Sequence, residues 1–230
     1  MNKVTWIIFS AAVVLILGGL VAYSHLSNPS IDVSSIDTNK IITASEQNGQ
    51  IADHVYGKAD SKVIFVEYGD YQCPSCSAAN PQLKAATEAY KDEVAFVFRN
   101  FPLTTIHPNA RVAAAAAEAA GLQGKFWEMH NLIYTGQSDW EKLSGNQRTN
   151  LFVGYANQLG LDATKFTSDL GSTAVNQKIS FDQAIGKKIG VNATPIFYLN
   201  GKQLAGDDAG QIVQGSTTVL TGLFDKALGK

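Results

Sequence analysis

The chain has 230 residues, of which 45% are hydrophobic and 17% are charged, and this composition suits one globular domain with an appendage. Its formal net charge of −2 offers no basic surface to a nucleic-acid partner. Its two cysteines, Cys73 and Cys76, are too few for a disulfide framework or a four-cysteine zinc site. No histidine lies at zinc-finger spacing from them, so we predict no metal in the functional site.

Residues 6–23 form an uncharged apolar stretch that is long enough, at about 1.5 Å per helical residue, to cross a bilayer. Lys3 precedes the stretch and the next basic residue is Lys40, so the local charge bias places the N-terminus in the cytoplasm and the domain outside. We predict a retained membrane anchor over residues 1–24, because the stretch exceeds the usual signal-peptide core of roughly 7 to 15 residues. A cleaved signal peptide is the alternative, since residues 22–24 form a small-x-small site. Both alternatives deliver the domain to a compartment where disulfides persist.

Residues 25–50 are rich in Ser, Asn, Asp and Thr, contain Pro29 and lack sustained hydrophobic periodicity. This composition is typical of a tether between folded parts. We therefore predict a flexible linker at residues 25–50, which holds a folded domain at residues 51–230 away from the bilayer.

The first predicted strand of the domain covers residues 63–68, where β-branched and aromatic residues make both faces apolar. A helix is predicted from residue 74 to residue 91, with Pro74 at its first position. Cys73 therefore lies at a helix N-terminus, where unpaired N–H groups and the helix dipole stabilise a thiolate and lower the thiol pKa. Cys76 lies one turn further on and is expected to be shielded. The pair thus combines an exposed nucleophile with a resolving thiol, as thiol-disulfide exchange requires.

A second buried strand is predicted at residues 94–99, and the helix between the two strands provides a crossover compatible with parallel pairing. From residue 103 to about residue 190 the sequence favours helices separated by glycine-containing breaks, which predicts a helical subdomain. Its expected helices cover residues 110–120, 126–134, 146–159, 163–170 and 179–189.

The last part of the domain is predicted to form a β-hairpin and a helix. A strand at residues 196–199 is followed by Asn200 and Gly201, a strong signal for a two-residue hairpin turn, and by a short strand around residues 203–204. The chain is then expected to end in one helix at residues 209–228.

Four further residues are given structural roles. Asp70 is expected to form the turn before the motif and to cap the following helix. His107 and His130 are expected to act in packing or capping, because the sequence pairs neither with a nucleophile. Trp127 is expected to belong to the core.

This order of elements and motifs resembles the thioredoxin superfamily, and most closely its DsbA-like branch. The resemblance covers residues 53–228 and implies an α/β thioredoxin fold with an inserted helical subdomain at about residues 103–190. The predicted N-terminal transmembrane helix precedes that fold. Five motifs in this order carry the resemblance: residues 68–76 (YGDYQCPSC), 98–103 (FRNFPL), 107–110 (HPNA), 124–130 (GKFWEMH) and 193–195 (ATP).

The resemblance implies a cis peptide bond before Pro195, in a loop beside the two sulfurs, with Thr194 offering backbone groups to an extended substrate. Base rates alone would favour a trans bond, and a proline that merely begins a strand is the alternative. Recognition by main-chain hydrogen bonds suits an enzyme that accepts many unfolded substrates. Pro74 and Ser75 complete the active-site loop. Strongly oxidising DsbA enzymes often carry histidine at the position of Ser75, so we expect a less stabilised Cys73 thiolate here.

Glu67 lies in the apolar strand six residues before Cys73, where the resembled family carries an acidic residue beneath its active site. A buried carboxyl group is costly without a partner, and burial raises its pKa. Two roles stay open for Glu67. It could relay a proton to and from Cys76 as the disulfide opens and closes, or form a structural ion pair, with Arg99 on the neighbouring strand as a partner.

The resemblance and the apolar N-terminal segment together predict an extracytoplasmic thiol-disulfide oxidoreductase, held at the cell membrane by a single span. It would introduce disulfides into secreted or membrane proteins, with its own disulfide as the redox centre and no other cofactor. The expected partners are unfolded cysteine-containing secreted proteins and a membrane redox partner of a DsbB-like or quinone-linked type. The alternatives are a reductase or isomerase supplied with electrons, and a non-catalytic holdase. If the N-terminal segment is cleaved, the protein would be secreted or periplasmic.

Overall fold

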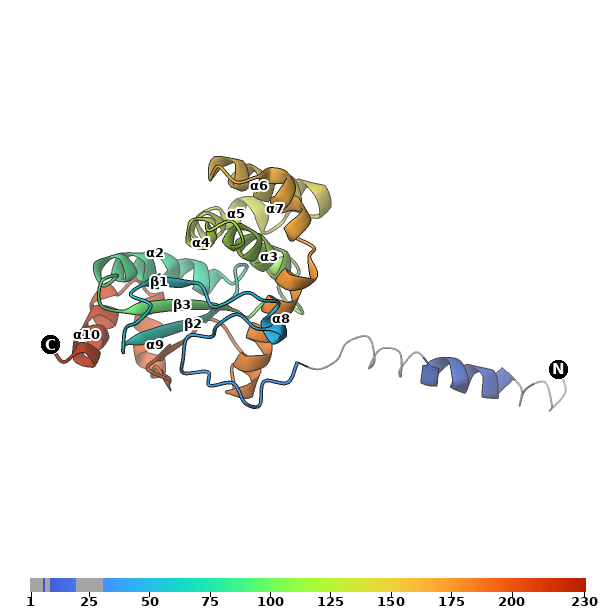
Figure 1. The fold of residues 1–230 in the computed structure, drawn as a ribbon, viewed down its shortest axis with the longest axis horizontal. Coiled ribbons are helices and arrows are strands. Elements are labelled where there is room, and N and C mark those ends of the chain that lie inside the picture. The colour runs from blue at the N-terminus through green and yellow to red at the C-terminus, as the bar shows by residue number, and fades with distance from the viewer. Residues whose placement is uncertain (1–5, 7–8, 20–30) are drawn as a thin grey trace. The chain divides into compact units, whose positions relative to one another are not determined.

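The computed structural model describes residue 6, residues 9–19 and residues 31–230, and it divides into two units, Met1–Asp32 and Val33–Lys230 (Figure 1). In the first unit, residues 9–19 are helical. The predicted anchor at residues 1–24 includes residues 1–5, 7–8 and 20–24, which lie outside the described residues. Within the described part of the chain, no helix combines the length and apolar character that crossing a membrane requires.

The second unit is built on a mixed five-stranded sheet in the order β1-β3-β2-β4-β5. β2 and β3 are parallel, as the sequence predicts, while β1, β4 and β5 each run antiparallel to their neighbours. The β4-β5 hairpin turns at Asn200 and Gly201, which both adopt positive φ, and this confirms the hairpin prediction. The strands are β1 (Val55–Gly57), β2 (Ile64–Gly69), β3 (Ala95–Asn100), β4 (Ile196–Leu199) and β5 (Lys202–Gln203).

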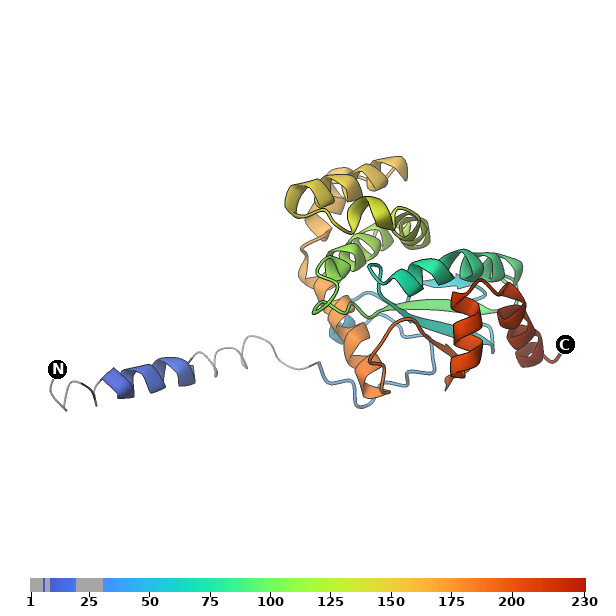
Figure 2. The same ribbon diagram turned by 180° about the vertical axis from the view of Figure 1, so that it is seen from behind.

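Helix α2 (Pro74–Ala89) connects the parallel strands, and a block of helices follows between β3 and β4. Both views show α3 to α7 on the side of the sheet where α2 lies (Figures 1 and 2). This stretch also contains a four-residue helix, α5, that the sequence does not predict. The helices of the block are α3 (Ala110–Gly121), α4 (Phe126–Thr135), α5 (Gln137–Trp140), α6 (Gly145–Gln158), α7 (Ala163–Asp169) and α8 (Thr173–Lys188).

The C-terminal helix predicted at residues 209–228 is two helices, α9 (Gly206–Val213) and α10 (Thr217–Leu228), so the prediction of one continuous helix is wrong. Gly215 has φ +108°, a backbone conformation that an α-helix does not accommodate. Ser216 then begins α10, because its hydroxyl oxygen accepts a hydrogen bond from the N–H of Val219 at 3.4 Å.

Two hydrophobic clusters hold the domain together. Under α2, α9 and α10, the ring of Phe224 packs edge-on against both Phe65 and Phe96, with centroids 5.4 Å apart in each pair. In the helical block, the alanines of α3 are buried against α4 and α7. The small alanine side chains let α3 and α4 approach closely. α4 in turn contacts α2, so the block lies beside the active-site helix.

The predicted linker at residues 25–50 is too long, because the folded unit already begins at Val33. Ile42 is buried, and the guanidinium group of Arg99 donates a hydrogen bond to the carbonyl oxygen of Thr38 at 2.7 Å. Arg99 bonds to backbone oxygens of the segment, those of Thr38 and Lys40. The composition therefore predicts a flexible tether, whereas in the structure residues 33–50 are bound to the domain. We call this segment the strap.

Candidate active site

Cys73 lies where β2 gives way to α2. Its N–H donates to the carbonyl oxygen of Asp70 at 3.0 Å, and its own carbonyl oxygen accepts the first helical hydrogen bond, from the N–H of Ser77 at 3.1 Å. Pro74 occupies the first helical position, where its missing N–H costs no intrahelical bond. The local sequence therefore places Cys73 at the N-cap of α2, with the free N–H groups of the first turn close to its sulfur.

The two thiols have opposite environments, and both are free cysteines in this structure. A hydrogen bond from Cys76, together with the N–H groups of Ser75 and Cys76, lowers the pKa of Cys73 to about 5, although partial burial opposes the shift. Complete burial raises the pKa of Cys76 well above its usual value. Cys73 is only 7% exposed, so it is less accessible than the sequence predicts. The arrangement still pairs a stabilised thiolate with a neutral, shielded thiol.

Thr194 and Pro195 lie beside the cysteine pair, although they are about 120 residues away along the chain. The Thr194–Pro195 peptide bond is cis. The thiol of Cys73 donates a hydrogen bond to the carbonyl oxygen of Thr194 at 3.4 Å. β4 begins at Ile196, so this loop lies at the end of the strand that pairs with β2.

Glu67 is buried in the middle of β2, with 6% exposure, between Phe98 on β3 and Phe197 on β4. Its Oε1 atom has no hydrogen-bond partner among the described residues. Burial, and secondarily the negative charge of the Cys73 thiolate, raise the pKa of this carboxyl group to about 8. Glu67 is therefore mostly protonated at neutral pH and lies close enough to the thiols to interact with their charge.

The predicted alternative pairing of Glu67 with Arg99 is wrong. In the parallel register Arg99 lies opposite Tyr68, and adjacent residues of a strand point to opposite faces of the sheet. Arg99 instead pairs with Asp53, with 2.8 Å between Nη2 and Oδ2. Among the described residues, Glu67 therefore forms no ion pair with Arg99.

Asp70 organises the loop before the motif. Its Oδ1 atom accepts from the N–H of Gln72 at 2.7 Å, and its Oδ2 atom accepts from the N–H of Leu103 at 2.8 Å. Oδ2 also pairs with Nδ1 of His107 at 2.8 Å. The predicted turn is present, but the predicted helix cap is not, because the carboxylate bonds to the loop after β3 instead of the first turn of α2. His107 was expected in packing or capping and instead pairs with this carboxylate.

The helical block also forms hydrogen bonds with the active-site segment. The sequence does not predict these contacts. The side-chain amide of Gln137 on α5 donates to the carbonyl oxygens of Tyr71 at 2.7 Å and of Cys73 at 3.2 Å. His130 on α4 is buried, hydrogen bonds with the hydroxyl group of Tyr71 at 3.0 Å, and has its pKa lowered to about 3 by burial. A lone glutamine 64 residues from Cys73 carries no sequence signal for this role.

Among the described residues, no group of three or more His, Cys, Asp or Glu side chains is placed to hold a metal ion. The groups that the structure places at the site are the thiol pair, the carboxyl group of Glu67 and the backbone of the proline loop.

Comparison with known proteins identifies related sequences. The model of a thioredoxin family matches residues 49–214. A Na(+)/H(+) antiporter NhaA 1 from Salinispora arenicola is 39% identical over 151 residues, which are 66% of this chain and 22% of that protein. A Na(+)/H(+) antiporter NhaA 1 from Mycolicibacterium gilvum is 38% identical over 165 residues, which are 70% of this chain and 26% of that protein. The chain thus spans about a quarter of the length of these curated relatives.

Solved structures also resemble this one. A thioredoxin-like oxidoreductase from Silicibacter pomeroyi is 26% identical, with a TM-score of 0.55 over 71% of this chain and 93% of that one. BdbD from Bacillus subtilis is 23% identical, with a TM-score of 0.63 over 83% and 100% of the two chains. MdbA, a thiol-disulfide oxidoreductase from Actinomyces oris, is 16% identical, with a TM-score of 0.65 over 81% and 97%. The last two similarities establish a shared fold.

Proposed function

This chain belongs to the thioredoxin family and has the fold of DsbA-like proteins, and we propose that it is a thiol-disulfide oxidoreductase that donates the Cys73–Cys76 disulfide to other proteins. The observation that carries this proposal is the contrast between the two thiols. The pKa of Cys73 is lowered to about 5 at the start of α2, whereas burial raises that of Cys76. This contrast makes Cys73 the better leaving group and Cys76 the internal nucleophile.

In the proposed reaction, a substrate thiolate attacks the Cys73 sulfur of the oxidised enzyme and forms a mixed disulfide. Cys76 leaves as a thiolate and takes up a proton, because its burial disfavours the charge. A second substrate thiolate then attacks the substrate sulfur of the mixed disulfide, and Cys73 leaves as the stabilised thiolate. The substrate loses two electrons to form its disulfide, and the enzyme gains them as a dithiol. Thr194 and Pro195 would hold the extended substrate through main-chain hydrogen bonds.

Glu67 is the proposed proton relay for Cys76, supported by its burial, its unpartnered Oε1 atom and its raised pKa. We expect Glu67→Gln to keep the fold but slow exchange at Cys76, and to remove a pH dependence centred near pH 8. The measurement is the rate of mixed-disulfide resolution by Cys76 in the reductive direction, from pH 6 to pH 10. An unchanged rate and pH profile would leave Glu67 with a structural role.

We also propose where in the cell the reaction takes place and with which partners. The apolar composition of residues 6–23 supports a single-span anchor with the domain outside the cytoplasm, where disulfides persist. Unfolded cysteine-containing secreted or membrane proteins would be the substrates. A membrane redox partner of a DsbB-like or quinone-linked type would reoxidise the dithiol. Digestion of the domain by protease added to intact spheroplasts or protoplasts, with a cytoplasmic protein protected in the same sample, would support this topology, and protection of the domain would contradict it.

The reduction potential of the pair decides the direction of electron flow. Potentials within this fold extend from roughly −270 mV in thioredoxin to about −120 mV in DsbA. We expect a value toward the DsbA end, with a thiolate absorbance that titrates near pH 5, because the thiolate of Cys73 is stabilised in the reduced form. The measurement is equilibration of the full chain with glutathione buffers. A fragment that begins at residue 51 would lack residues 33–50, which belong to the folded unit.

A reduction potential near that of thioredoxin would contradict the proposed oxidase function. It would favour a reductase or isomerase supplied with electrons. Ser75 in place of histidine is the observation that favours this second candidate, because serine adds no positive charge beside the thiolate. A double cysteine-to-serine variant that keeps full activity would instead identify a holdase.

A further inference from the structure

Asp70 lies in the turn between β2 and α2, and its main chain contacts both cysteines. Its carbonyl oxygen accepts a hydrogen bond from the N–H of Cys73 at 3.0 Å. Burial raises the pKa of Cys76, and a hydrogen bond from the N–H of Asp70 to its sulfur opposes that rise. The reaction proposed above assigns no role to this donor.

The sheet does not fix the backbone of Asp70. The pairing of β2 with β3 ends at Gly69 and its pairing with β4 ends at Tyr68, so Asp70 lies beyond both ladders. The side chain of Asp70 holds it instead. Its completely buried carboxylate accepts from the N–H of Gln72 at 2.7 Å, within the turn, and from the N–H of Leu103 at 2.8 Å. Leu103 belongs to the loop after β3, so a contact distant in sequence determines where Asp70 lies.

His107 completes this anchor from the same loop. Its Nδ1 atom lies 2.8 Å from Oδ2 of Asp70. Since a carboxylate oxygen only accepts, Nδ1 is the donor of this bond, and the carboxylate receives three donors. The N–H of His107 donates in turn to the carbonyl oxygen of Leu103 at 2.9 Å. The two groups that bond to Oδ2 therefore come from one hydrogen-bonded turn.

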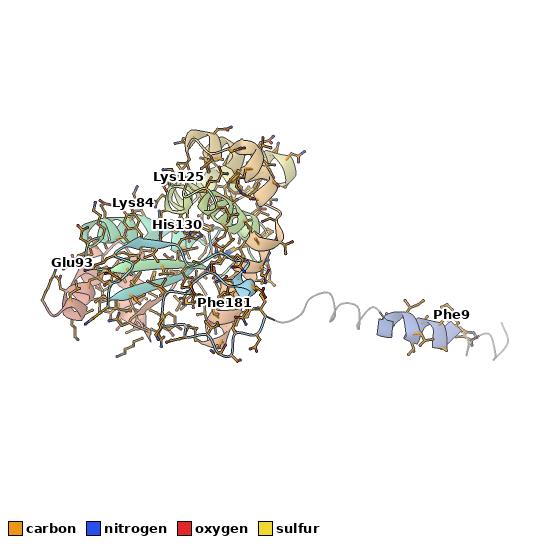
Figure 3. The ribbon with its side chains drawn as sticks, viewed as in Figure 1. Phe9, Lys84, Glu93, Lys125, His130 and Phe181 are labelled. Carbon is orange, nitrogen blue, oxygen red and sulfur yellow. The ribbon has the colours of Figure 1, made fainter. Side chains whose placement is uncertain are left out.

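A second histidine holds the next residue of the active-site turn. The hydroxyl group of Tyr71 hydrogen bonds with His130 on α4 at 3.0 Å, and Figure 3 labels His130. His130 is buried in the core, whereas the side chain of His107 is 16% exposed. His107 can therefore be replaced with less disturbance of the packing.

We propose that His107 is a positioning residue for thiol-disulfide exchange: through the carboxylate of Asp70, it holds the N–H of Asp70 against the sulfur of Cys76. This inference rests on the proposed function. When a substrate thiolate attacks Cys73, the bond between the two cysteines breaks and its electron pair leaves on the sulfur of Cys76. The N–H of Asp70 stabilises this charge as it forms, and stabilises the same thiolate when Cys76 attacks in the reverse direction.

The step at Cys76 is isolated by mixing the reduced full chain with dithiobis(nitrobenzoate), a small disulfide oxidant. The thiolate of Cys73 first displaces one thionitrobenzoate and forms a mixed disulfide. The thiolate of Cys76 then attacks the Cys73 sulfur, the protein disulfide forms, and the second thionitrobenzoate leaves. Absorbance follows both releases, so the first phase reports on Cys73 and the second on Cys76.

Two variants of one residue separate the donor from the side chain that carries it. His107→Leu removes the donor, whereas His107→Asn supplies an amide N–H at about the position of Nδ1. We expect the second phase to slow about threefold at pH 7 in His107→Leu and to recover in His107→Asn. The first phase should stay unchanged, because a hydrogen bond from Cys76 and the N–H groups of the first turn of α2 stabilise the thiolate of Cys73.

His54→Leu is the matched control, because His54 is 18% exposed and lies 2.9 Å from the completely buried carboxylate of Glu118. It removes the same kind of pair from another part of the fold, so both phases should keep their rates. Asp70→Asn is a second test. Its amide has one acceptor oxygen in place of two, so this variant should also slow the second phase.

Three outcomes would overturn the role of His107: an unchanged second phase in His107→Leu, a second phase as slow in His107→Asn as in His107→Leu, or an equal slowing of both phases. If His107→Leu does not fold, an unchanged second phase in Asp70→Asn would overturn it. A parent chain that shows no second phase would instead contradict the proposed function, and the role of His107 with it, because Cys76 would not be the internal nucleophile.

Discussion

Replacing Cys73 with serine should abolish disulfide transfer, while replacing Cys76 with serine should trap the enzyme as a mixed disulfide with its substrate. The difference follows from the positions of the two sulfurs. Cys73 lies at the start of α2 beside Thr194 and keeps 7% of its surface exposed, whereas Cys76 has none. A serine hydroxyl group forms no bond with sulfur under these conditions, so Cys73→Ser accepts no substrate and Cys76→Ser has no internal nucleophile to release one.

Two assays test this. Oxidation of a reduced, unfolded protein by the disulfide form of the parent chain measures transfer, and mass spectrometry measures the adducts that each variant forms with a disulfide-containing protein, because the Cys73 thiolate must displace one sulfur of an existing disulfide to form the mixed disulfide. Ala78→Ser is the matched control, since Ala78 is exposed on α2 and the change also introduces a hydroxyl group. We expect this control to turn over normally. A covalent adduct on Cys73→Ser, with none on Cys76→Ser, would reverse the roles assigned to the two cysteines.

Replacing Asp53 with alanine should lower the free energy of unfolding by about 3 to 5 kcal/mol. Asp53 joins two completely buried cations, with 2.8 Å to Arg99 and 3.1 Å to Lys178, and Lys178 also lies 2.7 Å from Asp182. Removing Asp53 leaves Arg99 without its carboxylate partner in an interior that cannot hydrate it. Such uncompensated buried charge is among the most costly single changes in a protein.

Urea denaturation of the variant and the parent chain tests this result. Lys165→Ala is the control, because the pair of Lys165 with Asp169 lies at the surface and is expected to contribute at most about 1 kcal/mol. A loss below about 1 kcal/mol in Asp53→Ala would contradict the assigned role of the network.

The same network makes stability depend on pH in two opposite ways. Burial raises the pKa of Asp53, but Lys178 and Arg99 outweigh it and hold the value at about 2, so its contribution is present above about pH 4 and is lost as the pH falls toward 2. Burial raises the pKa of Asp182 to about 6. Between about pH 4 and pH 6 the folded state therefore retains a proton that the unfolded state has lost, and this contribution to stability decreases as the pH rises.

The parts of the fold that local sequence patterns specify were predictable. Apolar runs of strand length, the proline at the start of α2 and the Asn200-Gly201 turn each act through neighbouring residues, and the structure has the corresponding elements. The two thiols were equally visible, because Cys73 and Cys76 are the two cysteines of the chain and flank a helix start.

The features that sequence did not predict depend on partners far along the chain. Arg99 bonds to Asp53 and to backbone oxygens of the segment taken for a linker, and no local pattern identifies a carbonyl oxygen as an acceptor. Gln137 reaches the active-site backbone from an unpredicted four-residue helix. The break at Gly215 was missed because a glycine within a helical pattern does not show whether the chain continues or turns.

If residues 6–23 form the membrane anchor that we propose, the start of the folded unit at Val33 would limit how far the domain can lie from the bilayer. With the anchor we propose at residues 6–23, nine residues, 24–32, connect it to the folded unit. Their fully extended length is about 30 Å, whereas a linker over residues 25–50 would extend to about 90 Å. If this anchor is present, the domain would stay within a short distance of the bilayer, and the membrane redox partner that we propose would be at high local concentration there.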